Sequence, residues 1–243
     1  MHFPSHPPLM PNRLRSSARQ RIAGVSVILS VAFACACSCW PGSDGRTAVA
    51  LNALNLTWFV CYAVGQSDRR FAMVILSAGV FGLTELAADY LCVRHTGTLD
   101  YSIAGSAMIL ESPWWMPLSW GVVAVQVGIV GDAVIAGYGK LRGTLATALF
   151  GALLIPFYEE MAWGADWWRY RDCLMLSHTP VYIIVAELVI AGSRALWGRA
   201  VLRTDSPAVA LALGAAAGVA TIGGGVIGWG TIEFLFRGVR LLP

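Results

Sequence analysis

The stretch IPFYEEMAWGADWWRYRD, residues 155–172, follows an apolar run, RGTLATALFGALL, residues 142–154. Together they predict a helix that crosses a membrane and ends in two adjacent carboxylates, Glu159 and Glu160, before a cluster of tryptophans and arginines. A carboxylate in lipid is costly unless it is paired, protonated or facing a polar cavity. We therefore expect a functional site near the end of this helix.

The composition predicts an integral membrane protein. The chain has 243 residues, of which 57% are hydrophobic and 13% charged, with a mean hydropathy of +0.64. A soluble domain usually carries about 25% charged residues. The single lysine, Lys140, falls in an expected loop, which excludes a retinal protein that needs a Schiff-base lysine inside a helix.

Seven segments have the roughly 20 apolar residues that a membrane span needs. They predict an all-α polytopic bundle with spans at 21–40, 47–65, 71–92, 115–137, 143–163, 179–198 and 207–236. We expect residues 1–20 to be a disordered basic tail and 21–243 to form the transmembrane domain. A secretory signal is the alternative interpretation of the first segment.

The basic residues predict an orientation, because loops on the cytoplasmic side carry more arginine and lysine. With the N-terminus inside, eleven basic residues fall inside: Arg13, Arg15, Arg19, Arg21, Arg69, Arg70, Lys140, Arg142, Arg194, Arg199 and Arg203. Six fall outside: Arg46, Arg94, Arg169, Arg171, Arg237 and Arg240. We expect a bacterial inner-membrane protein with a cytoplasmic N-terminus, an extracytoplasmic C-terminus and a site at the outer face.

The acidic residues of four spans fall at one depth near that face, given the rise of 1.5 Å per helical residue. They are Glu85, Asp89, Glu159, Glu160, Glu187 and Glu233, whereas Asp132 lies toward the inner side. Neighbouring residues on a helix point about 100° apart, and we expect Glu160 rather than Glu159 to face the bundle. The alternative is that acids near span ends simply lie in the interface.

Aromatic residues and histidines accompany the acids. We expect Tyr101, Trp115, Trp163, Trp167 and Tyr170 to line a pocket, although tryptophans at an interface also form an aromatic belt. His95 and His178 are predicted at the outer face, each followed by threonine. Each outer loop thus offers an acid, a histidine and a proline where the return helix begins. The loops also bring Cys92 and Cys173 toward one face, and spacing leaves open whether they pair.

The segment TELAADYLCVRHTGTLDYSIAGSAMILESPWWMPLSW, residues 84–120, resembles the carotenoid biosynthesis family that contains the membrane carotenoid 1′,2′-hydratases. The matching positions are Glu85, Thr96, Gly97, Tyr101, Pro117, Leu118 and Trp120. The resemblance implies a polytopic bundle that acts on an isoprenoid. The family's FGxYxY motif is replaced here by TLDYS. Small seven-span terpene cyclases are similar in size and plan.

These observations predict an enzyme that protonates a carbon–carbon double bond of an isoprenoid or other lipid, as a hydratase or cyclase does. The expected catalytic residues are Glu85, Glu160 and Glu187. The expected substrate-binding residues are Asp89, His95, Tyr101, Trp115, Glu159, Trp163, Trp167, Tyr170, His178 and Glu233. We expect a membrane lipid or isoprenoid partner, no nucleic acid and no cofactor or metal. The alternatives are a carrier for a lipid or small cation, and a metal enzyme that uses glutamate and histidine ligands.

Overall fold

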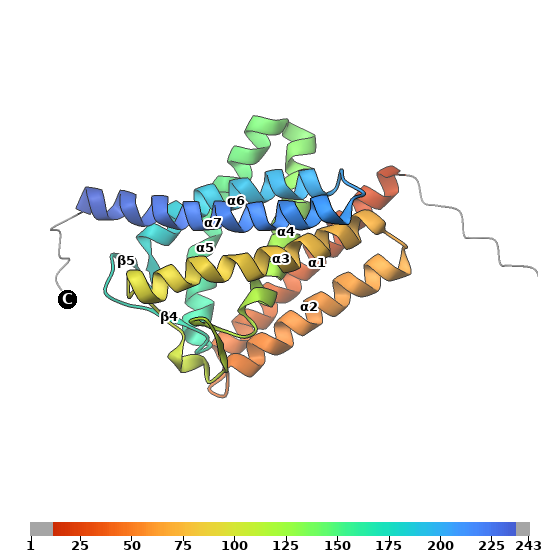
Figure 1. The fold of residues 1–243 in the computed structure, drawn as a ribbon. Coiled ribbons are helices and arrows are strands. Elements are labelled where there is room, and N and C mark those ends of the chain that lie inside the picture. Colours follow the sequence, from red (N-terminus) through yellow and green to blue (C-terminus); the bar gives the residue numbers. More distant parts are fainter. Residues whose placement is uncertain (1–11, 237–243) are drawn as a thin grey trace, which may run out of the picture.

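The computed structural model describes residues 12–236, with side chains from Arg15 onward. It is 78% helical, and seven of its helices are long and apolar enough to cross a membrane. The predicted all-α bundle is thereby confirmed (Figure 1). Residues 1–11 and 237–243, and with them the expected outer arginines Arg237 and Arg240, lie outside the described residues.

The seven long helices follow the apolar segments closely. They are α1 (Asn12–Ser38), α2 (Gly45–Gly65), α3 (Arg69–Tyr90), α4 (Met116–Tyr138), α5 (Lys140–Gly164), α6 (Val181–Val201) and α7 (Pro207–Phe236). A π-helical turn, η1 (Leu91–His95), extends α3.

The first helix begins earlier than the composition suggested. Residues 12–20, expected to be disordered, belong to α1. Arg19 donates two hydrogen bonds, of 2.7 and 2.6 Å, to the buried carboxylate of Asp68, which caps α3. This ion pair fixes the first turns of α1 to the start of α3.

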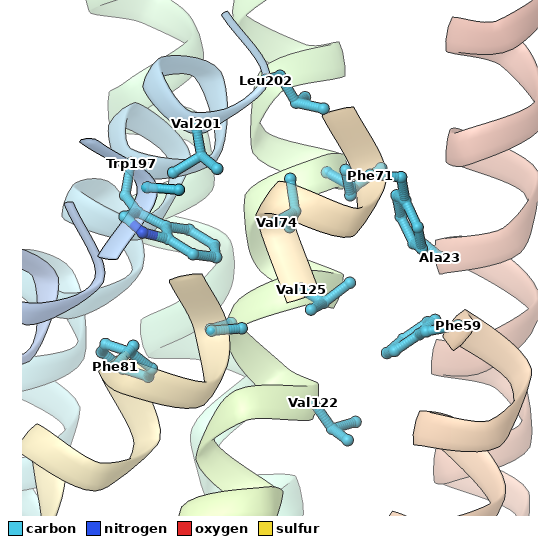
Figure 2. Close-up of a cluster of buried hydrophobic side chains, with 14 of the residues drawn as sticks. Ala23, Phe59, Phe71, Val74, Phe81, Val122, Val125, Trp197, Val201 and Leu202 are labelled. Atoms are coloured by element: carbon cyan, nitrogen blue, oxygen red, sulfur yellow. The ribbon is translucent and has the colours of Figure 1, made fainter. Parts of the chain in front are cut away.

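The apolar core lies between α3 and its neighbours. Figure 2 shows Phe71, Val74 and Phe81 of α3 between α2, α4 and α6. Phe81 and Trp197 of α6 have ring centroids 6.4 Å apart. This aromatic contact joins α3 to α6 at the centre of the bundle.

Helix α7 packs on α3 and α6 through small residues. An added Cβ at Gly214, Gly218 or Gly228 would collide with Ser77, Thr84 or Tyr182 respectively. In lipid, where the hydrophobic effect does not drive helices together, close backbone approach of this kind supplies the packing energy.

Short strands organise the two long loops at one end of the bundle. Strand β1 (Leu99–Asp100) of the first loop pairs antiparallel with β4 (Arg169–Tyr170) of the second. Two small hairpins precede the return helices: β2 (Met108–Ile109) with β3 (Ser112–Pro113), and β5 (Met175–Leu176) with β6 (Thr179–Pro180). The β1–β4 pairing joins the loops into one cap, and a 3₁₀ turn, η2 (Ser102–Ala104), follows β1. In Figure 1, β4 and β5 lie at the end where α7 finishes.

Candidate functional site: a buried acid cluster beneath the joined loops

Asp89, the last residue but one of α3, is held by the loop that follows this helix. It is 5% exposed and accepts hydrogen bonds from the Tyr101 hydroxyl at 2.9 Å and from the Ser112 hydroxyl at 3.0 Å. Burial first, and then the nearby carboxyls of Asp89 and Glu85, raises the pKa of Tyr101 well above its usual value. The Tyr101 hydroxyl therefore keeps its proton and remains a donor.

Glu159 is the corresponding acid at the end of α5. It is 5% exposed and accepts a hydrogen bond of 2.6 Å from the Trp168 indole and one of 3.5 Å from the Tyr170 hydroxyl. Burial and the neighbouring Glu159 also raise the pKa of Tyr170. Tyr170 thus lies beside Glu159 as a predicted site residue, and Trp168, which is outside the predicted set, adds a second donor.

The expected orientation of the two adjacent glutamates was wrong. Glu160, placed at the bundle centre by the sequence argument, has a one-third exposed side chain and points outward. Its carboxylate accepts from the backbone N–H of His178 at 3.0 Å and lies 2.8 Å from the Nδ1 atom of the same residue. The His178 ring stacks on Trp163 with centroids 3.9 Å apart. Glu160, His178 and Trp163 therefore form an outer surface group, while Glu159 faces the interior.

Glu187 forms the ionic part of the cluster with Arg194, two turns further along α6. The Nη1 atom of Arg194 lies 3.2 Å from Oε1 of Glu187, and the two side chains are 1% and 8% exposed. The guanidinium rests on the rings of Trp120 and Phe81, at 4.9 and 5.3 Å from their centroids. Cation–π contacts of this kind stabilise a charge that has left water.

Arg194 therefore does not belong to the inner loops, where the orientation argument counted it. When Arg194 is left out of the count, ten basic residues remain on the expected inner side and six on the outer side. The sequence already indicated that Arg194 could pair with Glu187, because it lies within the predicted sixth span and seven residues after Glu187. Residues two turns apart share a helix face.

Gly151 of α5 makes room for the Glu187 carboxylate. A Cβ atom at this glycine would lie 3.2 Å from Oε1 and 3.3 Å from Cγ of Glu187. The absence of a side chain brings α5 close to α6 at this depth. The backbone of α5 thus forms one wall of the acid cluster.

Glu85 completes the cluster from α3, one turn deeper than Asp89. It is 1% exposed and lies close enough to Arg194, Asp89 and Glu187 to interact with them electrostatically. Its Oε2 atom accepts no hydrogen bond from any described residue. The same holds for the Nε and Nη2 atoms of Arg194, which lies close enough to Glu85 to interact with it. Buried polar atoms nearly always have partners, so a group of this kind marks a site for a bound molecule or water.

Four buried carboxyl groups thus form one interacting group: Glu187 and Glu85 interact with Arg194, Asp89 interacts with Glu85, and Glu159 interacts with Glu187 and Asp89. They come from α3, α5 and α6, and the loops that hold Asp89 and Glu159 are joined by the β1–β4 pairing. We call these five residues the acid cluster. Of the six acids predicted near one face, four therefore meet in one cluster, whereas Glu160 and Glu233 lie outside it.

The remaining predicted site residues lie outside the acid cluster. Trp115 is buried and donates to Ser106 within the first outer loop at 3.1 Å. Trp167 donates to Thr47 at 2.9 Å, so it ties the second outer loop to α2. Trp163 is 41% exposed. The exposed ring of His95 packs on Tyr90, with centroids 6.1 Å apart. Glu233 is exposed on the last turns of α7.

The thiols Cys92 and Cys173 are both free. Burial raises the pKa of Cys173 to about 12, so its thiol stays protonated at neutral pH. Within residues 12–236, histidine, cysteine, aspartate and glutamate do not gather in a group of three that could hold a metal ion.

Two hollows occur elsewhere on the protein. A cavity of about 330 Å³ lies at the opposite end of the bundle, and a groove of about 440 Å³ follows the last turns of α7. Neither is lined by Glu85, Asp89, Glu159 or Glu187.

Comparison with known proteins finds one family. The family model described as "Domain of unknown function (DUF6989)" matches residues 86–232, more than half of the chain. The matched segment runs from the end of α3 through α7 and includes all of the acid cluster except Glu85, which immediately precedes it. Neither the curated proteins nor the solved structures contain a match.

Proposed function

The chain belongs to the family described as Domain of unknown function (DUF6989), and we propose that it is a membrane enzyme that protonates a double bond of an isoprenoid or other lipid. The observation that carries the proposal is the buried Oε2 atom of Glu85, which lacks a partner among the described residues, in a side chain that interacts electrostatically with Arg194. A carboxylic acid so placed has one oxygen free to face a substrate.

The chemistry needs an acid that holds its proton until the substrate arrives. In the proposed step the Glu85 O–H bond breaks, its proton forms a new C–H bond with the alkene, and a carbocation and a carboxylate result. Arg194 is placed to stabilise that carboxylate. Water or a second double bond then captures the cation, and loss of a proton to Asp89 or Glu159 completes the hydration or cyclisation.

The surroundings of Glu85 suit a cationic intermediate. The rings of Trp120 and Phe81 already carry the guanidinium of Arg194, so aromatic faces at this depth interact with positive charge. Electrostatic stabilisation by groups fixed in advance is often the largest contribution to catalysis. Glu160, formerly a candidate donor, is replaced by Glu159, because only Glu159 faces the cluster.

A second candidate is a carrier that binds a small cation or a lipid. The observation in its favour is the charge imbalance of the acid cluster, in which four carboxyls meet one guanidinium. The two functions differ in their products, because an enzyme leaves a changed lipid in extracts of expressing cells and a carrier does not.

The decisive experiment compares Glu85→Gln with Glu160→Gln in cells that make a protein-dependent lipid product. Glutamine keeps the shape of glutamate without the transferable proton. We expect Glu85→Gln to fold and to lose product formation by about 10²–10⁴-fold, the usual contribution of general acid catalysis. Glu160→Gln is the matched control and should retain activity. Full activity of both variants would show that Glu85 is not the proton donor.

We further infer that the acid cluster faces the outside of a bacterial inner membrane. Support comes from the ten basic residues expected at the opposite side against six at this side, since cytoplasmic loops are richer in arginine and lysine. In a cysteine-free background, Ser177→Cys should react with an impermeant thiol reagent in intact cells, and Ser67→Cys should not. The reverse labelling pattern would overturn this orientation.

A further inference from the structure

A second polar site occupies the opposite end of the bundle. The cavity of about 330 Å³ lies between the first turns of α1, the start of α3, the last turns of α4 and the end of α6. Its charged lining consists of one aspartate and four arginines: Asp132, Arg19, Arg70, Arg199 and Arg203. Ser16 and Gln20 of α1 add polar side chains. The acid cluster and this basic cavity are thus separate sites.

Two of the four arginines are held in place by ion pairs. Arg19 is bound to the buried Asp68 through Nε and Nη2. Although burial acts in the opposite direction, hydrogen bonds from Arg19 and the Phe71 N–H lower the pKa of Asp68. Arg199 donates to Asp132 at 3.0 Å through Nη1. Two walls of the cavity therefore carry guanidinium groups held in place by ion pairs.

The other two arginines leave positive charge at the cavity. Arg70 lies 3.6 Å from Asp205 in a loose pair in which both side chains are about half exposed or more. Arg203 is exposed, and the described part of the chain gives it no ion pair. Counted with their carboxylates, three of the arginines are balanced and Arg203 contributes one excess positive charge. The site therefore suits an anion of low charge.

The rest of the cavity lining is apolar and consists of Ile129 and Ala136 of α4 and Leu202. Its volume corresponds to roughly ten water molecules at about 30 Å³ each. That is enough room for a phosphate group with a small substituent. Arginine also binds phosphate through paired N–H donors.

We propose that this cavity binds a phosphate-bearing molecule. A phosphodiester lipid headgroup matches the size of the cavity and its single excess positive charge. Its position at the helix ends places it at headgroup depth, and basic pockets between transmembrane helices bind anionic headgroups in this way. A soluble phosphate offers the same chemistry, so the source of the phosphate is decided by the probes below.

The test uses the full purified chain in a neutral detergent. Three probes are titrated at low salt: dioctanoyl phosphatidylglycerol, dioctanoyl phosphatidylcholine and inorganic phosphate. Binding is followed by microscale thermophoresis. We expect phosphatidylglycerol to bind best, and its affinity to fall as salt screens the arginines. Phosphatidylcholine should bind more weakly, because its choline carries a positive charge. Tighter binding of inorganic phosphate would instead identify a soluble phosphate as the source.

Substitutions locate the binding. Arg203→Gln should raise the Kd of the bound probe about tenfold, which corresponds to about 1.4 kcal/mol, and Arg70→Gln should also weaken binding. The matched control is Arg142→Gln, which removes the same charge at the same end of the bundle but outside the cavity lining. Melting temperatures verify folding, and Arg203→Lys should restore part of the affinity. The proposal fails if no probe binds, or if Arg142→Gln weakens binding as much as Arg203→Gln.

Discussion

The two outer hairpins, α3 to α4 and α5 to α6, follow one plan. Each has a buried acid near the end of its first helix, Asp89 or Glu159, and each acid accepts a hydrogen bond from an aromatic side chain of its own loop. The sequences MILESP (108–113) and MLSHTP (175–180) form equivalent small hairpins. Their third residues, Leu110 and Ser177, share a φ of 54°.

The hairpins differ in where they place charge. At the surface of the first, Arg94 near the end of α3 pairs with Glu111 in the small hairpin, whereas in the second Glu160 near the end of α5 pairs with His178. In the interior, only the second carries a basic residue, Arg194. A similar backbone plan therefore supports opposite arrangements of charge, and the interior difference creates the candidate site.

The largest expected effect is the loss of stability when Arg194, the interior basic residue of the second hairpin, is replaced. Arg194→Met should lower the free energy of unfolding by about 3–5 kcal/mol, because breaking a buried ion pair leaves an uncompensated charge. Unfolding in mixed micelles with increasing sodium dodecyl sulfate measures the change. Adding Glu187→Gln to Arg194→Met should recover part of the loss.

The control for Arg194 is Arg199→Met on the same helix, which removes a partly exposed ion pair with Asp132 of α4. Such pairs contribute about 0–1 kcal/mol. Equal losses for Arg194→Met and Arg199→Met would show that the interior ion pair does not distinguish the two hairpins.

A smaller effect is expected where the two hairpins hold their buried acids. Tyr101→Phe removes a hydrogen bond of 2.9 Å to Asp89, whereas Tyr170→Phe removes one of only 3.5 Å to Glu159, which Trp168 already holds at 2.6 Å. Tyr101→Phe should cost about 1–2 kcal/mol and Tyr170→Phe less than about 0.5 kcal/mol. The same micelle unfolding assay measures both. A larger loss of unfolding free energy for Tyr170→Phe than for Tyr101→Phe would contradict the conclusion that Tyr101 holds its acid more strongly.

The smallest effect belongs to the surface pairs. Double-mutant cycles on Arg94 with Glu111, and on Glu160 with His178, should each give a coupling of about 0.2–1 kcal/mol, because these side chains are partly exposed. High salt should reduce both couplings. A coupling above about 2 kcal/mol in either pair would mean that the outer charges also stabilise the hairpins.

The sequence by itself determined the seven helices, because apolar runs of sufficient length have no other stable arrangement in lipid. It also determined that acids gather near one end, because depth follows from counting residues along each helix. Arg194 was determinable in the same way, since its spacing from Glu187 places both on one face of α6. It was missed because all arginines near span ends were assigned to loops.

Only the tertiary structure decided which of Glu159 and Glu160 faces the interior. The helical period predicts that the side chains of Glu159 and Glu160 point about 100° apart. Which of them faces the interior depends on the rotation of α5 about its axis, and neighbouring helices set that rotation. Gly151 fits against Glu187 on one side, and Trp168 reaches back to Glu159 from the loop. The β1–β4 pairing that joins the loops is likewise a contact between segments about 70 residues apart, and pairing over that distance is set by packing rather than by local sequence.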